Sequence, residues 1–267
     1  MLISFCTIQL VSYLLLNEKS EFSMVFIWGG LCAVLVGSAS NVVNDIYDFE
    51  IDKINRPDRI LPKQLVSIPN AWNYYFFLIC ISVISGYFLL PAIPFLIILI
   101  SNLILFIYSW KLKKTPMIGN IIVSFFIGLV FIYSTLLVDD YQQGIAPFIF
   151  AFFMILTREI VKDIEDMEGD RIQMARTIPI VWGIEKAKWI SIASLIVCFI
   201  SLISAFQLMY YGKTFLMIVS AFVILPGLVI CYKIYKGTQK KDFSSISMWL
   251  KLLILPSLTA IFLDKVI

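Results

Sequence analysis

The sequence contains no histidine at all, and only 15% of its 267 residues are charged. Without histidine, no imidazole can serve as a general base or as a metal or haem ligand. The five cysteines are scattered through apolar runs and form no Cys-x-x-Cys pair, so neither a zinc site nor a disulfide framework is predicted. The net charge of +3 is too small to form a basic surface, so no nucleic-acid partner is expected.

Hydrophobic residues, by contrast, make up 60% of the chain, and its mean hydropathy is +0.92. A soluble globular domain carries about 45–50% apolar and about 25% charged residues. This chain therefore has too little polar surface to cover its apolar mass in water. The composition excludes a soluble enzyme and a disordered regulator, and it predicts an integral, multi-pass membrane protein.

Long uncharged runs predict eight membrane-crossing helices, for which a bilayer requires about 20 residues each. They are Ser23–Val43, Ala71–Pro91, Ala92–Trp110, Ile118–Val138, Ile145–Thr157, Trp189–Tyr210, Thr214–Tyr235 and Ser247–Leu263. The fifth run is short, but it continues into a polar helical stretch. The apolar Met1–Leu16 is counted as a ninth span because it lacks the basic region and cleavage site of a signal peptide. We expect an all-α bundle of nine transmembrane helices in one domain, 1–267, with 23–138 and 145–263 as candidate internal repeats.

Basic residues are distributed unevenly between these spans. With Met1–Leu16 counted as span 1 and Ser23–Val43 as span 2, eighteen of the 21 lysines and arginines fall in the loops after even-numbered spans or at the helix ends beside them. The positive-inside rule places such loops in the cytoplasm. In the cell membrane or inner membrane, the N-terminus is therefore expected on the cytoplasmic side and the C-terminus on the outer side.

Two segments at the ends of even-numbered spans repeat one acidic pattern. Asp45, Asp48 and Asp52 stand at i, i+3 and i+7, which places them within about 60° on one helix face. The second copy of this spacing consists of Asp163, Asp166 and Asp170. Like charges at such spacings destabilise a helix, and ionisable groups at membrane depth usually mark function. Solvation of helix ends explains two matched stripes poorly, so we interpret them as a binding site on the cytoplasmic side.

Carboxylates without histidine or cysteine favour hard cations, and Mg²⁺ typically binds a few carboxylates together with phosphate oxygens of a substrate. Cations that can bind a phosphate stand nearby, with Arg56 one turn beyond Asp52 and lysines 111, 113 and 114 in a loop on the same side. The pattern predicts two facing metal clusters bridged by a diphosphate.

The motif Asn44-Asp45-x-x-Asp48-x-x-x-Asp52 followed by Arg56-Pro57, together with Asp163-x-x-Asp166-x-x-x-Asp170, resembles the UbiA superfamily of intramembrane prenyltransferases. The resemblance covers nearly the whole chain. It implies nine helices, a cytoplasmic active site, two Mg²⁺ ions, a polyprenyl diphosphate donor and an acceptor nucleophile that attacks C1 of the donor.

The resemblance also implies roles for single residues. The expected catalytic metal ligands are Asp45, Asp48, Asp52, Asp163, Asp166 and Asp170. The residues expected to bind the diphosphate are Asn44, Arg56, Tyr108, Lys113 and Lys162. Lys162 can equally be a lysine whose stem lies in the membrane and whose ammonium reaches the interface. Asn120 either faces the cavity or bridges helices, and the sequence does not distinguish the two.

The stretch from Lys162 to Asp170, followed by Ala175-Arg-Thr177-Ile-Pro179, is most similar to the digeranylgeranylglyceryl phosphate synthase-like branch. That branch implies transfer of a geranylgeranyl group to the hydroxyl of geranylgeranylglyceryl phosphate, in ether-lipid synthesis. The alternatives are acceptors of the 4-hydroxybenzoate, dihydroxynaphthoate or homogentisate type, and a chlorophyll synthase-like activity.

Two functions outside the superfamily fit the sequence less well. A CDP-alcohol phosphotransferase requires an Asp-Gly before Ala-Arg, which is absent here. An ion or phosphate transporter built on inverted repeats has its site near the midplane, whereas both acidic stripes lie at span ends.

The first span is unusually short. Met1–Leu16 gives about 24 Å of helix against a hydrocarbon core of about 30 Å. Members of the superfamily usually open helix 1 with an Arg-x-x-Asn-like stretch that is absent after Met1. Either this chain lacks one phosphate-binding cation, or its true start lies roughly 10–20 residues upstream. We expect the second, in line with the length that a membrane span needs.

Overall fold

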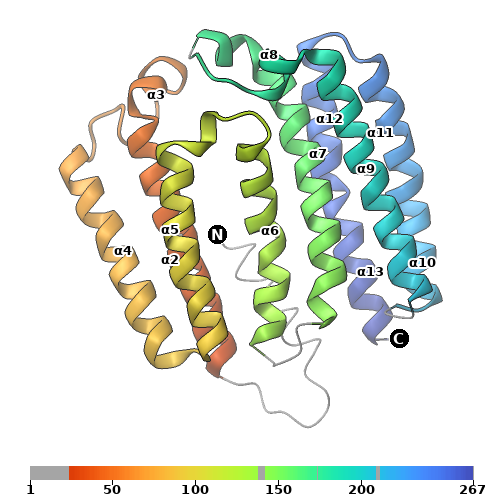
Figure 1. The fold of residues 1–267 in the computed structure, drawn as a ribbon, viewed down its shortest axis with the longest axis horizontal. Helices are drawn as coiled ribbons and strands as arrows, with labels where there is room; N and C mark the ends of the chain where they lie inside the picture. The colour runs from red at the N-terminus through yellow and green to blue at the C-terminus, as the bar shows by residue number, and fades with distance from the viewer. Residues whose placement is uncertain (1–23, 138–141, 173, 209–210, 267) are drawn as a thin grey trace. The chain divides into compact units, whose positions relative to one another are not determined.

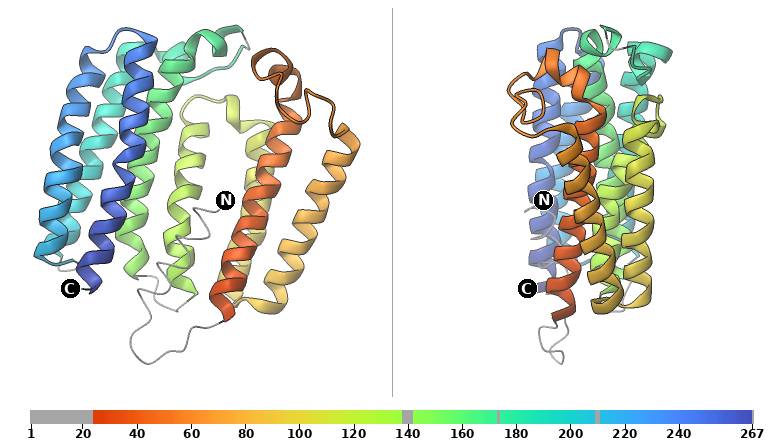
Figure 2. Two further views of the ribbon diagram at one scale, coloured as in Figure 1. Left: turned by 180° about the vertical axis from the view of Figure 1, so that it is seen from behind. Right: turned by 90° about the vertical axis from the view of Figure 1, so that its left-hand side faces the viewer.

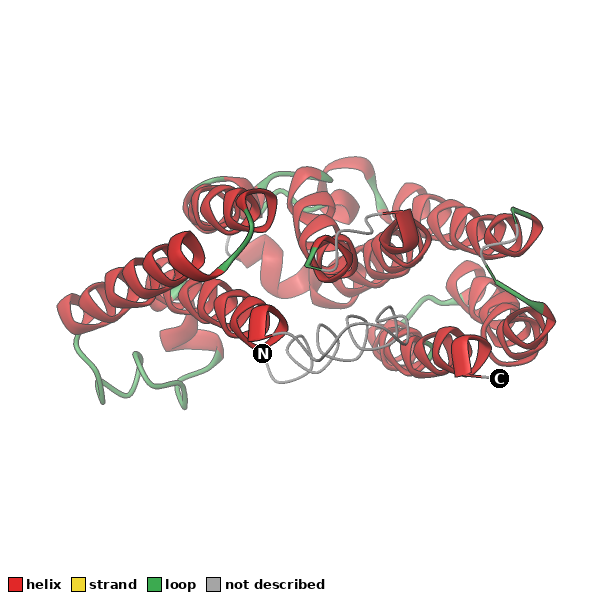
Figure 3. Ribbon diagram, turned by 90° about the horizontal axis from the view of Figure 1, so that it is seen from below, coloured by secondary structure: helices red, strands yellow, loops and turns green. Residues whose placement is uncertain are grey.

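The computed structural model describes residues 24–137, 142–172, 174–208 and 211–266. Every regular element in these ranges is a helix, and Figure 3 shows only helices and connecting loops there. The helices are α2 (Met24–Tyr47), α3 (Phe49–Asn55), α4 (Ile68–Leu89), α5 (Ala92–Trp110), η1 (Leu112–Lys114), α6 (Ile118–Leu136), α7 (Gln142–Ile172), α8 (Ile178–Trp182), α9 (Ile184–Gln207), α10 (Lys213–Val219), the π-helical η2 (Ser220–Ile224), α11 (Leu225–Lys236), α12 (Lys240–Leu252) and α13 (Ile254–Val266).

Eight stretches of helix are long and apolar enough to cross a membrane. They are Met24–Tyr47, Ile68–Leu89, Ala92–Trp110, Ile118–Leu136, Gln142–Ile172, Ile184–Gln207, Lys213–Lys236 and Lys240–Ile261. Each corresponds to one of the predicted apolar runs, so the all-α, multi-pass class is confirmed. The predicted first span, Met1–Leu16, lies outside the described residues, and the count of nine stays a prediction.

The fifth predicted span continues into a polar helical stretch, as expected. The apolar run Ile145–Thr157 is only part of α7, which continues without a break to Ile172 and has 31 residues. Helical hydrogen bonding does not end where hydrophobicity ends, and the polar second half of α7 contains no proline to interrupt it. The second acidic stripe therefore lies on the same rigid helix as the apolar run.

Contacts divide the chain into two compact units, one formed by Met1–Lys113 and Val130–Gly144, the other by Lys114–Leu129 and Ile145–Ile267. Each unit contains one of the acidic segments. The prediction of a single domain with an internal repeat is not tested by this division.

In the first unit, α2 packs against α4 and α5. Between α2 and α4 lies a cluster of Ala39, Val43, Tyr75 and Leu78, all nearly fully buried. Figure 2 shows α3 continuing beyond the end of α2 before the chain turns back into α4. The start of α4 is defined by Ser67, whose hydroxyl accepts a hydrogen bond from the backbone N–H of Asn70.

In the second unit, α7 and α9 are joined by hydroxyl groups as well as by apolar packing. The Ser194 hydroxyl of α9 donates to the Phe153 carbonyl of α7 at 3.0 Å. Such interhelical hydrogen bonds are typical of helices packed in a membrane, where apolar contacts alone do not distinguish a neighbouring helix from lipid. The core around them includes Met154, Ile160 and Leu195, which are fully buried. This packing fixes α7, and with it the second acidic segment.

Candidate functional site

The first acidic segment crosses the junction between α2 and α3. Asp48 stands between the two helices, yet its N–H bonds to the Asn44 carbonyl at 2.9 Å and its carbonyl accepts from the Asp52 N–H at 2.8 Å. Because this i to i−4 pattern continues through the junction, the helical periodicity is kept. Asp45, Asp48 and Asp52 therefore share one face, as the spacing predicted.

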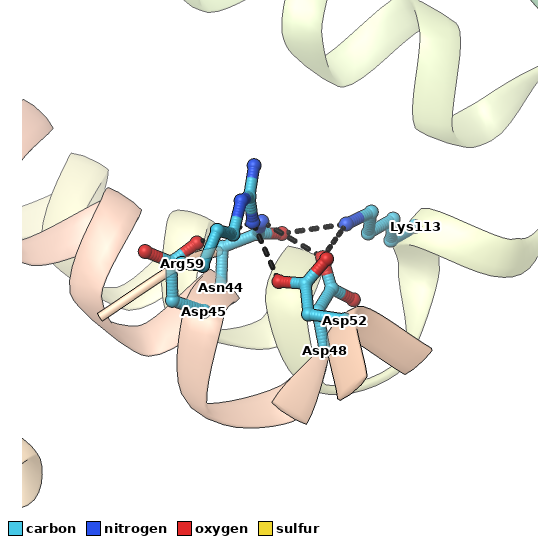
Figure 4. Close-up of polar contacts among 6 residues, drawn as sticks. All are labelled: Asn44, Asp45, Asp48, Asp52, Arg59 and Lys113. Atoms are coloured by element: carbon cyan, nitrogen blue, oxygen red, sulfur yellow. Dashed lines mark hydrogen bonds and ion pairs between the residues drawn. The ribbon is translucent and has the colours of Figure 1, made fainter. Parts of the chain in front are cut away.

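Asp45 and Asp52 meet at one cation. The Nη1 atom of Arg59 donates to Asp45 Oδ1 at 2.9 Å and to Asp52 Oδ2 at 2.6 Å (Figure 4). The side chain of Asp52 is only 8% exposed, whereas that of Asp45 is 44% exposed. A spacing of seven residues brings two side chains to nearly the same angle around a helix, which lets one atom contact both.

Asp48 belongs to a second group of contacts. The Lys113 ammonium donates to Asp48 Oδ2 and, at 2.9 Å, to Asn44 Oδ1 (Figure 4). The Asn44 amide in turn donates to Asp48 Oδ2 at 3.0 Å. Lys113 is carried to this position by η1, the short turn that follows α5. Asn44 and Lys113, both predicted as site residues, are thus brought together with the first stripe.

The predicted site residues include Arg56 but not Arg59. Arg56 is exposed, and within the described part of the chain no ion pair involves it. After Arg56 the chain turns at Pro57, and successive turns are closed by Arg59 N–H to Arg56 carbonyl and Lys63 N–H to Arg59 carbonyl, both at 3.0 Å. This turn brings Arg59 back toward α2. The one available signal was Arg-Pro followed by a second arginine in a turn-forming stretch.

Tyr108 lies in the last turn of α5 and is half-buried. The neighbouring Ser109 is 6% exposed, and its hydroxyl has no hydrogen-bond partner within the described residues. Together with Lys113 these residues place polar groups at the end of an otherwise apolar helix.

The second acidic segment lies on the polar half of α7. Asn120, near the start of α6, donates from its side-chain amide to Asp163 Oδ2 at 2.8 Å. Asn120 is 8% exposed. Asn120 thus bridges α6 and α7, and its partner is the first aspartate of the stripe.

The other residues predicted as site groups in this segment are half-buried. Asp166 and Asp170 follow Asp163 on α7, and Lys162 precedes it. Glu159, one turn earlier, pairs with its neighbour Arg158 at 2.5 Å. The predicted second stripe thus exists as a helical face with one carboxylate held by an amide from another helix.

The donor chemistry suits a hard cation. The carboxylates and amides offer oxygen atoms only, and the two contacts of Arg59 Nη1 show that one positive atom can contact Asp45 and Asp52 together. Among the described residues, no three acidic or cysteine side chains form a ready-made cluster for a metal ion. Mg²⁺ does not need one, because it usually binds one or two carboxylates plus substrate phosphates and keeps several waters. The residues present therefore fit Mg²⁺.

Comparison with known proteins matches the UbiA prenyltransferase family over residues 5–253. Digeranylgeranylglyceryl phosphate synthase of Methanosphaera stadtmanae is 33% identical over 235 residues, covering 86% of this chain and 84% of that protein. The enzyme of the same name from Methanobrevibacter smithii is 34% identical, covering 80% of this chain and 77% of that protein.

Solved structures of UbiA homologues have the same fold as this chain. A structure described as digeranylgeranylglyceryl phosphate synthase in membranes superposes with a TM-score of 0.86 at 25% identity, covering 98% of this chain and 93% of that one. A UbiA homologue from Archaeoglobus fulgidus bound to DMAPP and Mg²⁺ has a TM-score of 0.70 at 18% identity, covering 97% and 96%. The chain, an all-α multi-pass membrane protein with two acidic helical segments, belongs to the UbiA prenyltransferase family.

Proposed function

We propose that this prenyltransferase is a digeranylgeranylglyceryl phosphate synthase. It transfers a geranylgeranyl group from its diphosphate to the free hydroxyl of geranylgeranylglyceryl phosphate. The observation that carries the proposal is the identity of about one third to synthases of this name over four fifths or more of the chain. The stretch from Lys162 to Asp170 supports the same branch.

In this reaction the hydroxyl oxygen of the acceptor forms a bond to C1 of the donor. The bond between C1 and the diphosphate oxygen breaks, its electron pair leaves with the diphosphate, and the hydroxyl proton is released. The barrier lies in the separation of charge at C1 and the leaving oxygen. A site that places positive charge beside the leaving group lowers this barrier.

We infer that Mg²⁺ takes part, as two ions held by the two acidic segments. UbiA homologues from Archaeoglobus fulgidus have been solved with Mg²⁺ and DMAPP or GPP, which supports metal dependence for this chain. When bound, Mg²⁺ neutralises charge that develops on the diphosphate. Asp45, Asp48, Asp52, Asp163, Asp166 and Asp170 are the residues that would hold it.

The chain's own side chains have separate tasks in this scheme. Lys113, already beside Asp48 and Asn44, supplies a positive charge that can reach a diphosphate bound at the first stripe. Arg56, Tyr108 and Lys162 remain proposed diphosphate ligands. Asn120 holds Asp163 in a fixed orientation. We place these groups on the cytoplasmic side because of the basic residues around them.

Product analysis by mass spectrometry tests this function. Purified protein is incubated with Mg²⁺, geranylgeranyl diphosphate and one candidate acceptor at a time. We expect the digeranylgeranylglyceryl phosphate mass with geranylgeranylglyceryl phosphate only. Transfer to 4-hydroxybenzoate, dihydroxynaphthoate or homogentisate instead overturns the acceptor assignment. Ion or phosphate flux in proteoliposomes without any prenylated product overturns the enzyme assignment.

A further inference from the structure

We propose that Arg59 is a positioning residue that holds Asp45 and Asp52 together in the metal-free protein and leaves them when Mg²⁺ binds. The inference rests on the Mg²⁺-dependent function proposed above. Arg59, Asp45 and Asp52 all belong to the first unit.

The geometry singles out Arg59. Its Nη1 contacts one oxygen of each carboxylate, at 2.9 Å and 2.6 Å, so a single positive atom lies between Asp45 and Asp52. Figure 4 shows the guanidinium between Asp45, on α2, and Asp52, on α3. A divalent cation that uses these two carboxylates must compete for the same oxygens.

Because Asp52 is buried, competition between Arg59 and Mg²⁺ for its carboxylate has a large effect on stability. The Asp52 side chain is only 8% exposed and that of Arg59 33% exposed, so water solvates this pair less than a surface pair. A buried carboxylate that loses its cation is strongly destabilised, whereas exchange of one cation for another leaves the charge compensated. Arg59 therefore stabilises the metal-free state, and for the same reason it opposes metal binding.

Lys113 does not share this role at Asp45 and Asp52. Its ammonium contacts Asp48 and Asn44, the second group of contacts on the stripe. Lysine 113 also comes from the α5 side of the unit, whereas Arg59 comes from the loop between α3 and α4. Removal of Arg59 consequently exposes one carboxylate pair and leaves the other contacts in place.

The loop that carries Arg59 offers a matched control. Lys63 lies four residues later, is 48% exposed at its side chain, and pairs at 3.0 Å with Asp58, which is 91% exposed. Lys63→Gln removes one positive charge from the same loop without touching the stripe. It thereby separates the local contact from the general electrostatic field.

The test is titration of the full-length, detergent-solubilised protein with MgCl₂ alone, followed by calorimetry. Neither donor nor acceptor is present. We expect Arg59→Gln to bind Mg²⁺ about tenfold more tightly than the wild type, since the metal no longer has to displace a charge-assisted hydrogen-bonded partner. Lys63→Gln should bind as the wild type does.

Thermal unfolding gives a second measurement on the same proteins. Without Mg²⁺ the midpoint of Arg59→Gln should fall by several degrees, and saturating Mg²⁺ should raise it more than it raises that of the wild type. Arg59→Lys, which keeps one charge but loses the planar fork, should lie between the two in both measurements. This variant also serves if Arg59→Gln fails to fold.

The proposed replacement of Arg59 by Mg²⁺ is overturned if Arg59→Gln binds Mg²⁺ no more tightly than the wild type does. It is also overturned if neither protein binds Mg²⁺. A midpoint that falls by the same amount with and without Mg²⁺ also overturns it and leaves Arg59 a purely structural clamp. The proposed function is decided separately, because it depends on the prenylated product and not on this titration.

Discussion

The side-chain amide of Asn120 donates a 2.8 Å hydrogen bond to Asp163, so α6 holds the first aspartate of the second acidic segment. In the first segment the corresponding contact comes from within the helix, where Asn44 donates to Asp48 four residues later at 3.0 Å. Each segment therefore contains one aspartate held by an amide. The amide fixes the carboxylate oxygen that it contacts and leaves the other oxygen available.

Asn120→Leu should lower the rate of prenyl transfer about 10- to 100-fold. The hydrogen bond joins an amide to a charged group, and such bonds contribute about 1.5–3 kcal/mol, which corresponds to this range if Asp163 must be oriented in the transition state. Initial rates measured over a range of Mg²⁺ concentrations test the effect. The Mg²⁺ concentration for half-maximal rate should rise as well.

Asn102→Leu is the control for this prediction. Asn102 is another buried interhelical amide, in the middle of α5, and it donates to Ser82 Oγ at 3.1 Å. It should change stability without changing Mg²⁺ dependence. If both variants shift Mg²⁺ dependence alike, the role assigned to Asn120 is wrong.

Asp48→Asn and Asp166→Asn should each abolish transfer while the protein stays folded. Each loses a charge that Mg²⁺ or the diphosphate complex requires, which should cost several kcal/mol of transition-state stabilisation, or at least about 100-fold in rate. The assay is product formation at normal Mg²⁺, with circular dichroism to confirm the helical content.

Neighbouring acids that lie off the stripes provide controls for the two variants. Glu50 is exposed and pairs only with Lys53 among the described residues, at 2.8 Å, and Glu168 is an exposed residue of α7. Glu50→Gln and Glu168→Gln should retain activity. Full activity in Asp48→Asn or Asp166→Asn would contradict the proposal that two Mg²⁺ ions are held by the acidic segments.

Topology can be tested with single cysteines in a variant that lacks the five native ones. A cysteine at Gln239, directly before α12, should react with an impermeant thiol reagent only from the cytoplasmic side. A cysteine at Gln142, where α7 begins, should react only from outside. The reason is that eighteen of the 21 basic residues flank the loops predicted to be cytoplasmic. Labelling from the opposite sides would reverse the orientation of the acidic segments.

Much of the fold was predictable because a bilayer constrains sequence strongly. A helix must bury about 20 apolar residues to cross it, so runs such as Ala92–Trp110 and Ile118–Val138 were recognisable without any contact information. The sequence did not show where α7 ends, because its polar half continues the helix after the apolar signal stops. Helix length there depends on backbone propensity and packing, which hydropathy does not measure.

The acidic stripes were predictable for a similar reason. Helical periodicity is a local property, so the spacing of Asp45, Asp48 and Asp52 was enough to place them on one face. Their partners were not local. Arg59 reaches Asp45 across fourteen positions because the chain turns after α3, and Lys113 reaches Asp48 across sixty-five. No spacing rule indicated which of Arg56 and Arg59 would return to the helix.

The chemistry of the chain thus follows from residue types and their helical spacing, since both the membrane and the α-helix impose regular patterns on a sequence. The choice of counter-ion and of hydrogen-bond donor follows from tertiary packing. Arg59, Lys113 and Asn120 contact the aspartates because a turn, a short helix and a neighbouring helix bring them there. These contacts join residues far apart in the chain, and their geometry depends on how the elements between them fold.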